Sequence, residues 1–125
     1  MTKDKDISLR AYKILRIMIQ AYLKFLTAQA ADKKRLELSA NQVQLLEYIF
    51  KEATTGRLLR VQDLITLSMI ASQATLHGEL KGLIAKGLIL AKANKTDGRV
   101  KEIVLTTAGK QYFARLEAAI AKAVK

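Results

Sequence analysis

Positive charge is concentrated in one short stretch of the sequence, residues 86–101. Lysine and arginine side chains bind phosphate oxygens and release counterions from a double helix. The whole chain has 22 Lys and Arg residues against 11 Asp and Glu, a formal net charge of +11. The stretch itself has a net charge of +4, because Asp97 is its one acid beside five basic residues, namely Lys86, Lys92, Lys95, Arg99 and Lys101. The pattern indicates contact with a polyanion such as duplex DNA, and a solvated charged hairpin is the alternative.

Polar side chains precede this basic stretch on a predicted helix, residues 72–86. Its expected buried row is Leu76, Leu80, Leu83 and Ile84, and the opposite surface is bare because Gly78 and Gly82 lie on it. Glycine inside a helix costs about 1 kcal/mol relative to alanine, so we expect close approach of DNA, or of a second protein, to offset this cost. Glutamine can pair with adenine through two hydrogen bonds, whereas hydroxyls more often hold phosphates. The predicted DNA contacts on this helix are Ser72, Gln73, Thr75, His77 and Lys81, with Gln73 reading a base and Ser72 and Thr75 on phosphates.

The composition argues against catalysis and cofactor binding. The chain has no Cys, which excludes disulfides, thiolate metal sites and cysteine nucleophiles. Its single histidine, His77, is expected at the flank of the helix as a partly buried polar residue or a phosphate donor, and not as a metal ligand. Because the 11 acids are scattered, the sequence predicts neither an enzyme nor a cofactor site.

The sequence also argues against a membrane protein. Arg16, Gln20 and Lys24 interrupt the most apolar run, which therefore falls short of the ~18 residues of a membrane span. We expect no secretory signal from residues 1–6, because they do not begin a short apolar segment with a cleavage site. We therefore expect a cytoplasmic protein.

Residues 7–30 predict a long helix that is apolar around more than half of its circumference. A helix on the surface of one domain needs an apolar stripe of only ~100°. The surplus predicts a second copy of the chain as partner, and the alternative is a position between two helices of the same domain. The predicted dimerisation residues lie on this helix and near the end of the chain: Tyr12, Leu15, Ile19, Tyr22, Leu26, Ile120 and Val124.

Capping and turn residues predict the remaining elements. Ser39 and Gln42 match a capping box, Ser72 matches an N-cap and Gly87 a C-cap. Asp97-Gly98 predicts the turn of a hairpin. These residues bound a charged connector at 32–35, a helix from 39 that ends at 54–56, a short strand at 57–60, helices at 61–67 and 72–86, strands at 88–93 and 100–105, and a helix at 107–125 capped by Thr106 or Thr107.

The order of these elements predicts a winged helix-turn-helix, because two short adjacent helices are followed by a two-stranded hairpin. The expected fold class is mainly α with a small β-hairpin and a long N-terminal dimerisation helix. Since no linker or repeat divides the sequence, we expect a single domain over 1–125. It comprises the dimerisation helix at 7–30, the winged helix-turn-helix core at 39–106 and the C-terminal helix at 107–125.

From Ser39 onward the sequence resembles the MarR-type transcriptional regulators. The resemblance is carried by the start of the recognition helix at 72–76, by Lys86-Gly87-Leu88-Ile89, by the turn at 95–99 and by Thr106-Thr107-Ala108-Gly109. The turn between the two motif helices departs from the family, which usually has a glycine where this chain has Ser68-Met69-Ile70-Ala71. The resemblance implies that Asp97 holds Arg99 in the wing. It also implies a small aromatic or phenolic effector that binds between the dimerisation helices and the DNA-binding part.

These observations lead to a first functional hypothesis, a homodimeric regulator that binds double-stranded DNA sequence-specifically. The recognition helix would enter the major groove, and Arg99 of the wing would enter the minor groove. Repression by occlusion of polymerase is expected, with activation as the alternative. The second hypothesis is a winged-helix protein-interaction module without specific DNA readout. Attachment to a membrane surface through the first helix ranks last.

Overall fold

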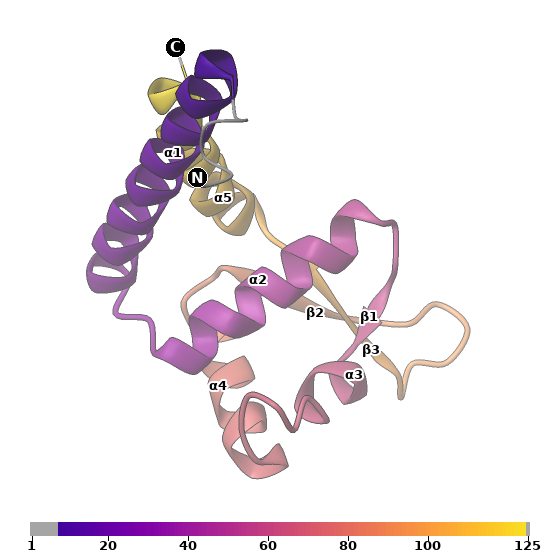
Figure 1. Ribbon diagram of the computed structural model, residues 1–125. Coiled ribbons are helices and arrows are strands. Elements are labelled where there is room, and N and C mark those ends of the chain that lie inside the picture. Colours follow the sequence, from indigo (N-terminus) through magenta and orange to yellow (C-terminus); the bar gives the residue numbers. More distant parts are fainter. Residues whose placement is uncertain (1–7, 125) are drawn as a thin grey trace.

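The computed structural model describes residues 8–124 of the chain (Figure 1). The predicted limits Ile7 and Lys125, and the segment 1–6, lie outside the described residues. No helix of the described part combines the length and the apolarity needed to cross a membrane. The elements are, in chain order, α1 (Leu9–Arg35), α2 (Ala40–Thr54), β1 (Leu59–Arg60), α3 (Val61–Ile65), α4 (Gln73–Ala85), β2 (Ile89–Ala93), β3 (Lys101–Leu105) and α5 (Thr107–Ala123).

The first helix, α1, is longer than predicted. It begins after the N-cap Ser8, whose hydroxyl accepts the amide of Ala11 at 3.1 Å, and it continues to Arg35. The prediction that residues 32–35 form a connector is wrong, because Asp32 is buried on α1 and pairs with two arginines. One of its oxygens lies 3.0 Å from Arg35 and the other 3.0 Å from Arg115 of α5. The basic residues of this last turn also interact favourably with the negative end of the helix dipole.

A tight turn joins α1 to α2. The amides of residues 36–38 donate to carbonyls of the last turn of α1 at 2.9–3.2 Å, and Glu37 has a left-handed backbone with φ of 54°. The predicted capping box is confirmed. The Ser39 hydroxyl accepts the Gln42 amide, and the Gln42 side chain accepts the Ser39 amide, both at 3.0 Å. The chain direction is therefore fixed by hydrogen bonds from the end of α1 to the first turn of α2.

The winged unit consists of α2, α3 and α4 with a three-stranded antiparallel sheet in the order β1-β3-β2. β2 and β3 form the predicted hairpin, with Lys92 opposite Glu102, and the short strand predicted at 57–60 pairs with β3 as β1. α3 ends at Ile65, earlier than predicted, whereas α4 begins after its N-cap Ser72 as expected. The predicted fold class, mainly α with a winged helix-turn-helix, is confirmed.

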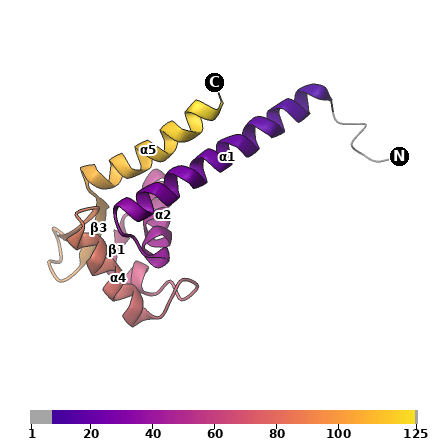
Figure 2. The same ribbon diagram turned by 90° about the vertical axis from the view of Figure 1, so that its left-hand side faces the viewer.

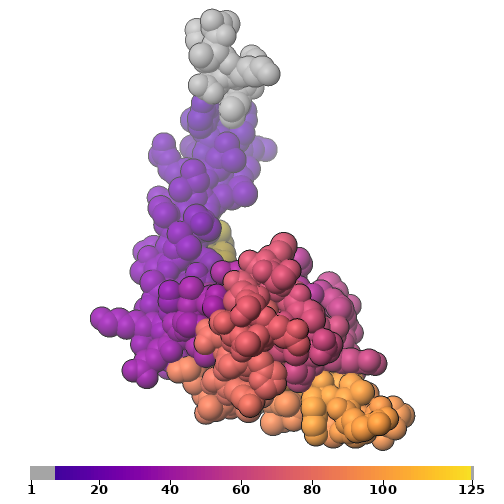
Figure 3. Space-filling view, turned by 90° about the horizontal axis from the view of Figure 1, so that it is seen from below, coloured from indigo at the N-terminus to yellow at the C-terminus, as the bar shows by residue number. Residues whose placement is uncertain are grey.

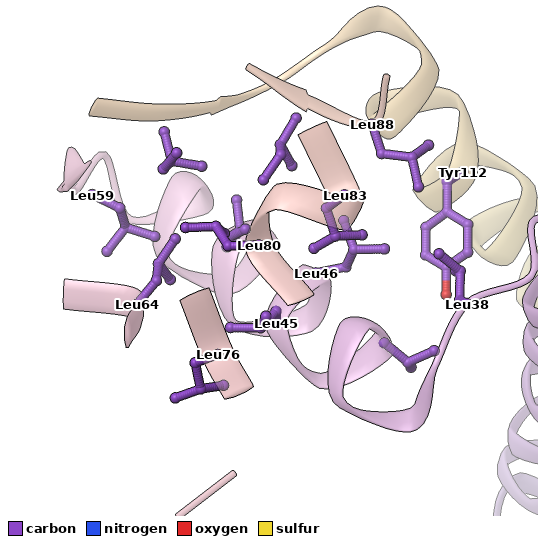
Figure 4. Close-up of a cluster of buried hydrophobic side chains, with 14 of the residues drawn as sticks. Leu38, Leu45, Leu46, Leu59, Leu64, Leu76, Leu80, Leu83, Leu88 and Tyr112 are labelled. Carbon is purple, nitrogen blue, oxygen red and sulfur yellow. The ribbon is translucent and has the colours of Figure 1, made fainter. Parts of the chain in front are cut away.

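The hydrophobic core lies between the sheet, the three helices and the first turns of α5 (Figure 4). Leu76, Leu80 and Leu83 of α4 are buried in it as predicted. The expected burial of Ile84 is wrong, since its side chain is 37% exposed. At 3.6 residues per turn, Ile84 lies about 80° around the helix from Leu76, at the edge of the buried stripe.

α5 begins at its N-cap Thr106 and runs beside α1 in the opposite direction. Both helices extend away from the winged unit, and α1 extends farther than α5 (Figure 2). The ion pair between Asp32 and Arg115 joins them near the winged unit. Of the residues of α1, Ala21 and Asp32 are buried, so most of this helix is open to solvent.

Candidate nucleic-acid interface

The recognition helix α4 and the loop between β2 and β3, called the wing below, lie on the same face of the molecule. Figure 3 shows this face, with the wing (orange) projecting from the edge of the winged unit. A projecting wing beside an accessible helix is the arrangement with which winged helices contact adjacent grooves of a duplex. The two predicted contact segments therefore form one surface.

Each predicted contact residue of α4 is exposed, namely Ser72, Gln73, Thr75, His77 and Lys81. The Ser72 hydroxyl accepts the Thr75 amide at 3.3 Å and donates to the Thr75 hydroxyl at 3.0 Å, so these two side chains cap the helix. The side chains of Gln73, His77 and Lys81 make no hydrogen bond with other described residues. His77 is exposed and lines a shallow surface with Ile65, Gln73 and Ala74, and its role as a phosphate donor stays a prediction.

The two glycines of α4 lie in different surroundings, so different contacts explain them. A Cβ added at Gly78 would meet nothing within 4 Å, so this position leaves the exposed face open. A Cβ at Gly82 would lie 2.5 Å from Nε2 of Gln42 in α2. The expectation that Gly82 belongs to the bare outer surface is wrong, because its close neighbour is a helix of the same chain.

The wing is held by hydrogen bonds within its own loop. Oδ1 of Asn94 accepts the amides of Thr96 at 2.8 Å and of Asp97 at 3.1 Å. Oδ1 of Asp97 accepts the Arg99 amide at 3.1 Å and lies 3.3 Å from Arg99 Nε, which is the predicted ion pair. Because the Arg99 side chain is 94% exposed, its base is fixed while its guanidinium extends into solvent.

The positive charge of the wing is smaller than the sequence count indicates. Lys92, Lys95 and Lys101 are exposed as expected. The side chain of Lys86 instead donates to the backbone carbonyl of Leu36 at 3.0 Å, beside the turn between α1 and α2. Lys86 therefore does not belong to the wing surface.

The sequence analysis did not predict that two apolar side chains of the winged unit are exposed. Met69, in the connection between α3 and α4, is 94% exposed, and Leu58, just before β1, is 58% exposed. Met69 lies in the segment 68–71, where the sequence departs from the pattern of the MarR-type regulators. This departure was the only sequence signal that the turn differs.

A second surface, far from the wing, is apolar. All predicted dimerisation residues are exposed in the single chain, with Ile19 at 61% and Tyr22 at 60%. The alternative that α1 lies between two helices of its own domain is wrong, because α1 packs chiefly along α5. The exposed apolar residues of α1 are Leu9, Tyr12, Ile14, Leu15, Ile17, Met18, Ile19, Tyr22, Leu23 and Leu26, and those of α5 are Ile120 and Val124.

An apolar cavity of about 230 Å³ lies where α1, α2 and α5 meet. The rings of Phe50 and Phe113 stack in its wall with centroids 4.1 Å apart. Two carboxylates, Glu47 and Glu117, also line it. Its walls can therefore surround an apolar ring and disfavour a negative charge.

No protein-family model and no curated protein matches this chain. Several solved structures are similar to it. The transcriptional regulator Tm0710 from Thermotoga maritima is 18% identical, with 92% of this chain and 75% of that chain covered and a TM-score of 0.65. A DNA complex of MepR from S. aureus is 22% identical, with 87% and 84% covered and a TM-score of 0.63. The heme sensor protein PefR from Streptococcus agalactiae, in complex with heme, is 25% identical, with 91% and 74% covered and a TM-score of 0.58.

Proposed function

We propose that this chain, which has the fold of the MarR-type transcriptional regulators, is a transcriptional regulator that binds double-stranded DNA as a homodimer. The observation that supports this most is the single exposed surface formed by α4 and the wing, in which the Arg99 side chain is 94% exposed. Similar solved structures include the transcriptional regulator Tm0710, AbfR bound to DNA and a MepR–DNA complex.

In this proposal α4 enters the major groove and the wing reaches the neighbouring minor groove. Gln73 reads an adenine edge, while Lys81 and His77 bind phosphates. Arg99 enters a minor groove narrowed by A·T-rich sequence, where negative potential is strongest. Lys92, Lys95 and Lys101 contact the flanking backbone, and Ser72 and Thr75 contribute amide and hydroxyl groups at the helix start.

The apolar surface of α1 and α5 supports the homodimer. Monomeric soluble proteins rarely expose apolar patches of more than a few hundred Å². Two copies that share this surface would bind a pseudo-palindrome whose half-sites are about one helical turn apart. Bound at a promoter, such a dimer would repress by occluding polymerase.

We place the implied effector in the cavity between α1, α2 and α5. A space of about 230 Å³ is enough for one aromatic ring, and the carboxylates Glu47 and Glu117 favour a ring that carries a positive charge. The resemblance implies a phenolic or other aromatic compound. The two carboxylates add the expectation that this compound carries a positive charge. A matched pair of aromatic amine and aromatic acid tests it by thermal shift, and stabilisation by the acid alone would contradict it.

Selection of bound duplexes from a random library, followed by sedimentation of the complex, tests the proposed function. We expect an inverted repeat bound by two chains. The logarithm of the binding constant should fall with the logarithm of salt concentration by about 0.9 per phosphate contacted. Absence of any selected sequence, or a shallow salt slope, would favour the protein-interaction module.

A further inference from the structure

One buried glutamine ties the recognition helix to the start of α2. Gln42 is only 6% exposed, although it is polar. Its Oε1 accepts the amide of Ser39 at 3.0 Å, and its Nε2 donates to the backbone carbonyl of Glu79 in α4 at 3.3 Å. The Ser39 hydroxyl also donates to the carboxylate of Glu79. The side-chain amide of Gln42 therefore closes the cap of α2 and holds the middle of α4 at the same time.

Gly82 lets α4 come this close. A Cβ at position 82 would lie 2.5 Å from Nε2 of Gln42, nearer than side chains tolerate. Since glycine costs about 1 kcal/mol in a helix interior, the contact with Gln42 is the evident reason for it.

The remaining contacts of α4 with α2 and the core specify its direction less strongly. Leu76, Leu80 and Leu83 bury their side chains, and apolar burial is not directional. Hydrogen bonds depend on angle and distance, so they resist rotation and sliding of the helix. Lys86 adds one more polar tie through the carbonyl of Leu36.

The turn before α2 connects the hydrogen bonds of Gln42 to those of α1. The amides of residues 36–38 all bond to the last turn of α1, and Leu38 is buried. α1, the turn, the first turn of α2 and α4 thus form a continuous series of hydrogen-bonded segments.

We propose that Gln42 is a positioning residue whose amide fixes the angle between α4 and α1. In a dimer joined through α1, this angle sets the separation of the two recognition helices, and hence the spacing of half-sites that the protein selects. The second part rests on the proposed function, whereas the angle itself can be measured without DNA.

The variant Gln42→Glu separates the two roles of this residue. Glutamate accepts the Ser39 amide as well as glutamine does, and it is common at this position of capping boxes. It has no N–H for the Glu79 carbonyl, so the cap stays and the hydrogen bond from residue 42 to α4 is lost, while the hydrogen bond from Ser39 to the Glu79 carboxylate remains. Gly82→Ala displaces the same amide from the other side and gains helix propensity, which provides a second variant if the first does not fold. Ile49→Val is the control, because it loses about 1 kcal/mol from the core with the tie intact.

The first measurement is the distance between spin labels on α1 and α4 within one chain. The natural sequence has no cysteine, so Lys24→Cys and Ala85→Cys place both labels, and dilution with unlabelled chain isolates pairs within one copy. We expect one narrow distribution for the parent and for Ile49→Val, and a shifted or broadened one for Gln42→Glu and Gly82→Ala. An unchanged distribution in both of these variants would overturn the proposal.

The second measurement is binding to duplexes whose half-site separation changes by one base pair at a time. We expect the parent to prefer one separation by about ten-fold or more, equivalent to about 1.4 kcal/mol, and Gln42→Glu to lose most of that preference with the same salt slope. A retained preference would overturn the spacing role and leave the proposed function intact. If the parent binds no duplex, the proposed function and the spacing role both fail, and the label distances still decide the angle.

Discussion

Arg99 is fixed at its base and free at its tip. Asp97 holds both its amide and its Nε, and the rest of the guanidinium extends from the wing. An arginine whose stem is already ordered loses less conformational entropy when it binds. This favours Arg99 over the lysines of the wing as the residue that enters a groove.

We expect Arg99→Ala to weaken duplex binding several-fold, because one charged contact is lost. The salt slope should fall by about 1. Stability should change little, since the side chain is 94% exposed. Affinity measured by titration at several salt concentrations checks this. Lys122→Ala, which removes the same charge from the last turn of α5, is the control and should bind almost as the parent does. An equal loss of affinity in both variants would mean that Arg99 contributes only to the overall positive potential and makes no specific contact with DNA.

Tyr112 contains a buried hydroxyl without a hydrogen-bond partner among the described residues. Burial raises its pKa above the ordinary 10.0, and the negative charges of Glu47 and Asp32 add to this effect. Because the unfolded chain ionises first, this tyrosine makes the fold less stable as pH rises above about 10.

We therefore expect Tyr112→Phe to raise the free energy of unfolding by about 1 kcal/mol at neutral pH, since an unpaired buried hydroxyl is removed. The advantage over the parent should grow above pH 10. Denaturant unfolding of both proteins at pH 7 and at high pH measures it. A loss of stability at pH 7 would mean that the hydroxyl has a partner in solution.

Sequence separation decides which side-chain contacts could be predicted. The pairs Ser39–Gln42 and Asp97–Arg99 lie two or three residues apart, and the sequence predicts both. Gln42 and Glu79 are 37 residues apart, and Asp32 and Arg115 are 83 apart. Such contacts depend on how the helices pack, so the reason for Gly82 and the length of α1 could not be read from local patterns.

At the scale of elements, the junction between α4, β2 and α5 is closely packed around Gly109. A Cβ at Gly109, in the first turn of α5, would overlap the backbone oxygen of Leu88 and lie 3.0 Å from Cδ2 of Leu105. Thr106 donates to the carbonyl of Gly87 at 2.6 Å. The sequence Thr106-Thr107-Ala108-Gly109 therefore packs the start of α5 against Gly87 and Leu88, the residues that follow α4.

We expect Gly109→Ala to lower the free energy of unfolding by about 2 kcal/mol or more, because backbone atoms cannot move aside cheaply. Gly78→Ala is the matched control, since its Cβ meets nothing and alanine favours a helix by about 1 kcal/mol. Thermal or urea unfolding of the two variants should give opposite signs. A stable Gly109→Ala variant would show that α5 can shift without cost.

Across the whole molecule, the predicted DNA-contact surface and the largest group of exposed apolar residues are separated. The basic wing and α4 occupy one face, and most of the exposed large apolar residues lie along α1 and the end of α5, with Leu58, Met69, Ile84 and Leu90 as the exceptions on the winged unit. This separation suits a protein that binds DNA with one surface and a second copy with the other. The sequence predicts both surfaces because each follows from local periodicity, whereas the angle between them depends on long-range contacts.

We expect Ile19→Glu to convert a dimer into a monomer, since an unpaired charge in an apolar interface costs about 3 kcal/mol or more. Gln20→Glu adds the same charge at the next position of α1 and should remain dimeric. Sedimentation of both variants at micromolar concentration measures the difference. A dimeric Ile19→Glu variant would mean that the copies associate through another face.

The far half of α1 has little cover from its own chain. If a second copy provides that cover, folding and association become one equilibrium, and the melting temperature must climb with protein concentration. A cell that synthesises only a few copies would then hold them as protease-sensitive monomers. For the function proposed above, this means that gene expression would respond only above a threshold of the protein's abundance, even for a promoter with a tight site.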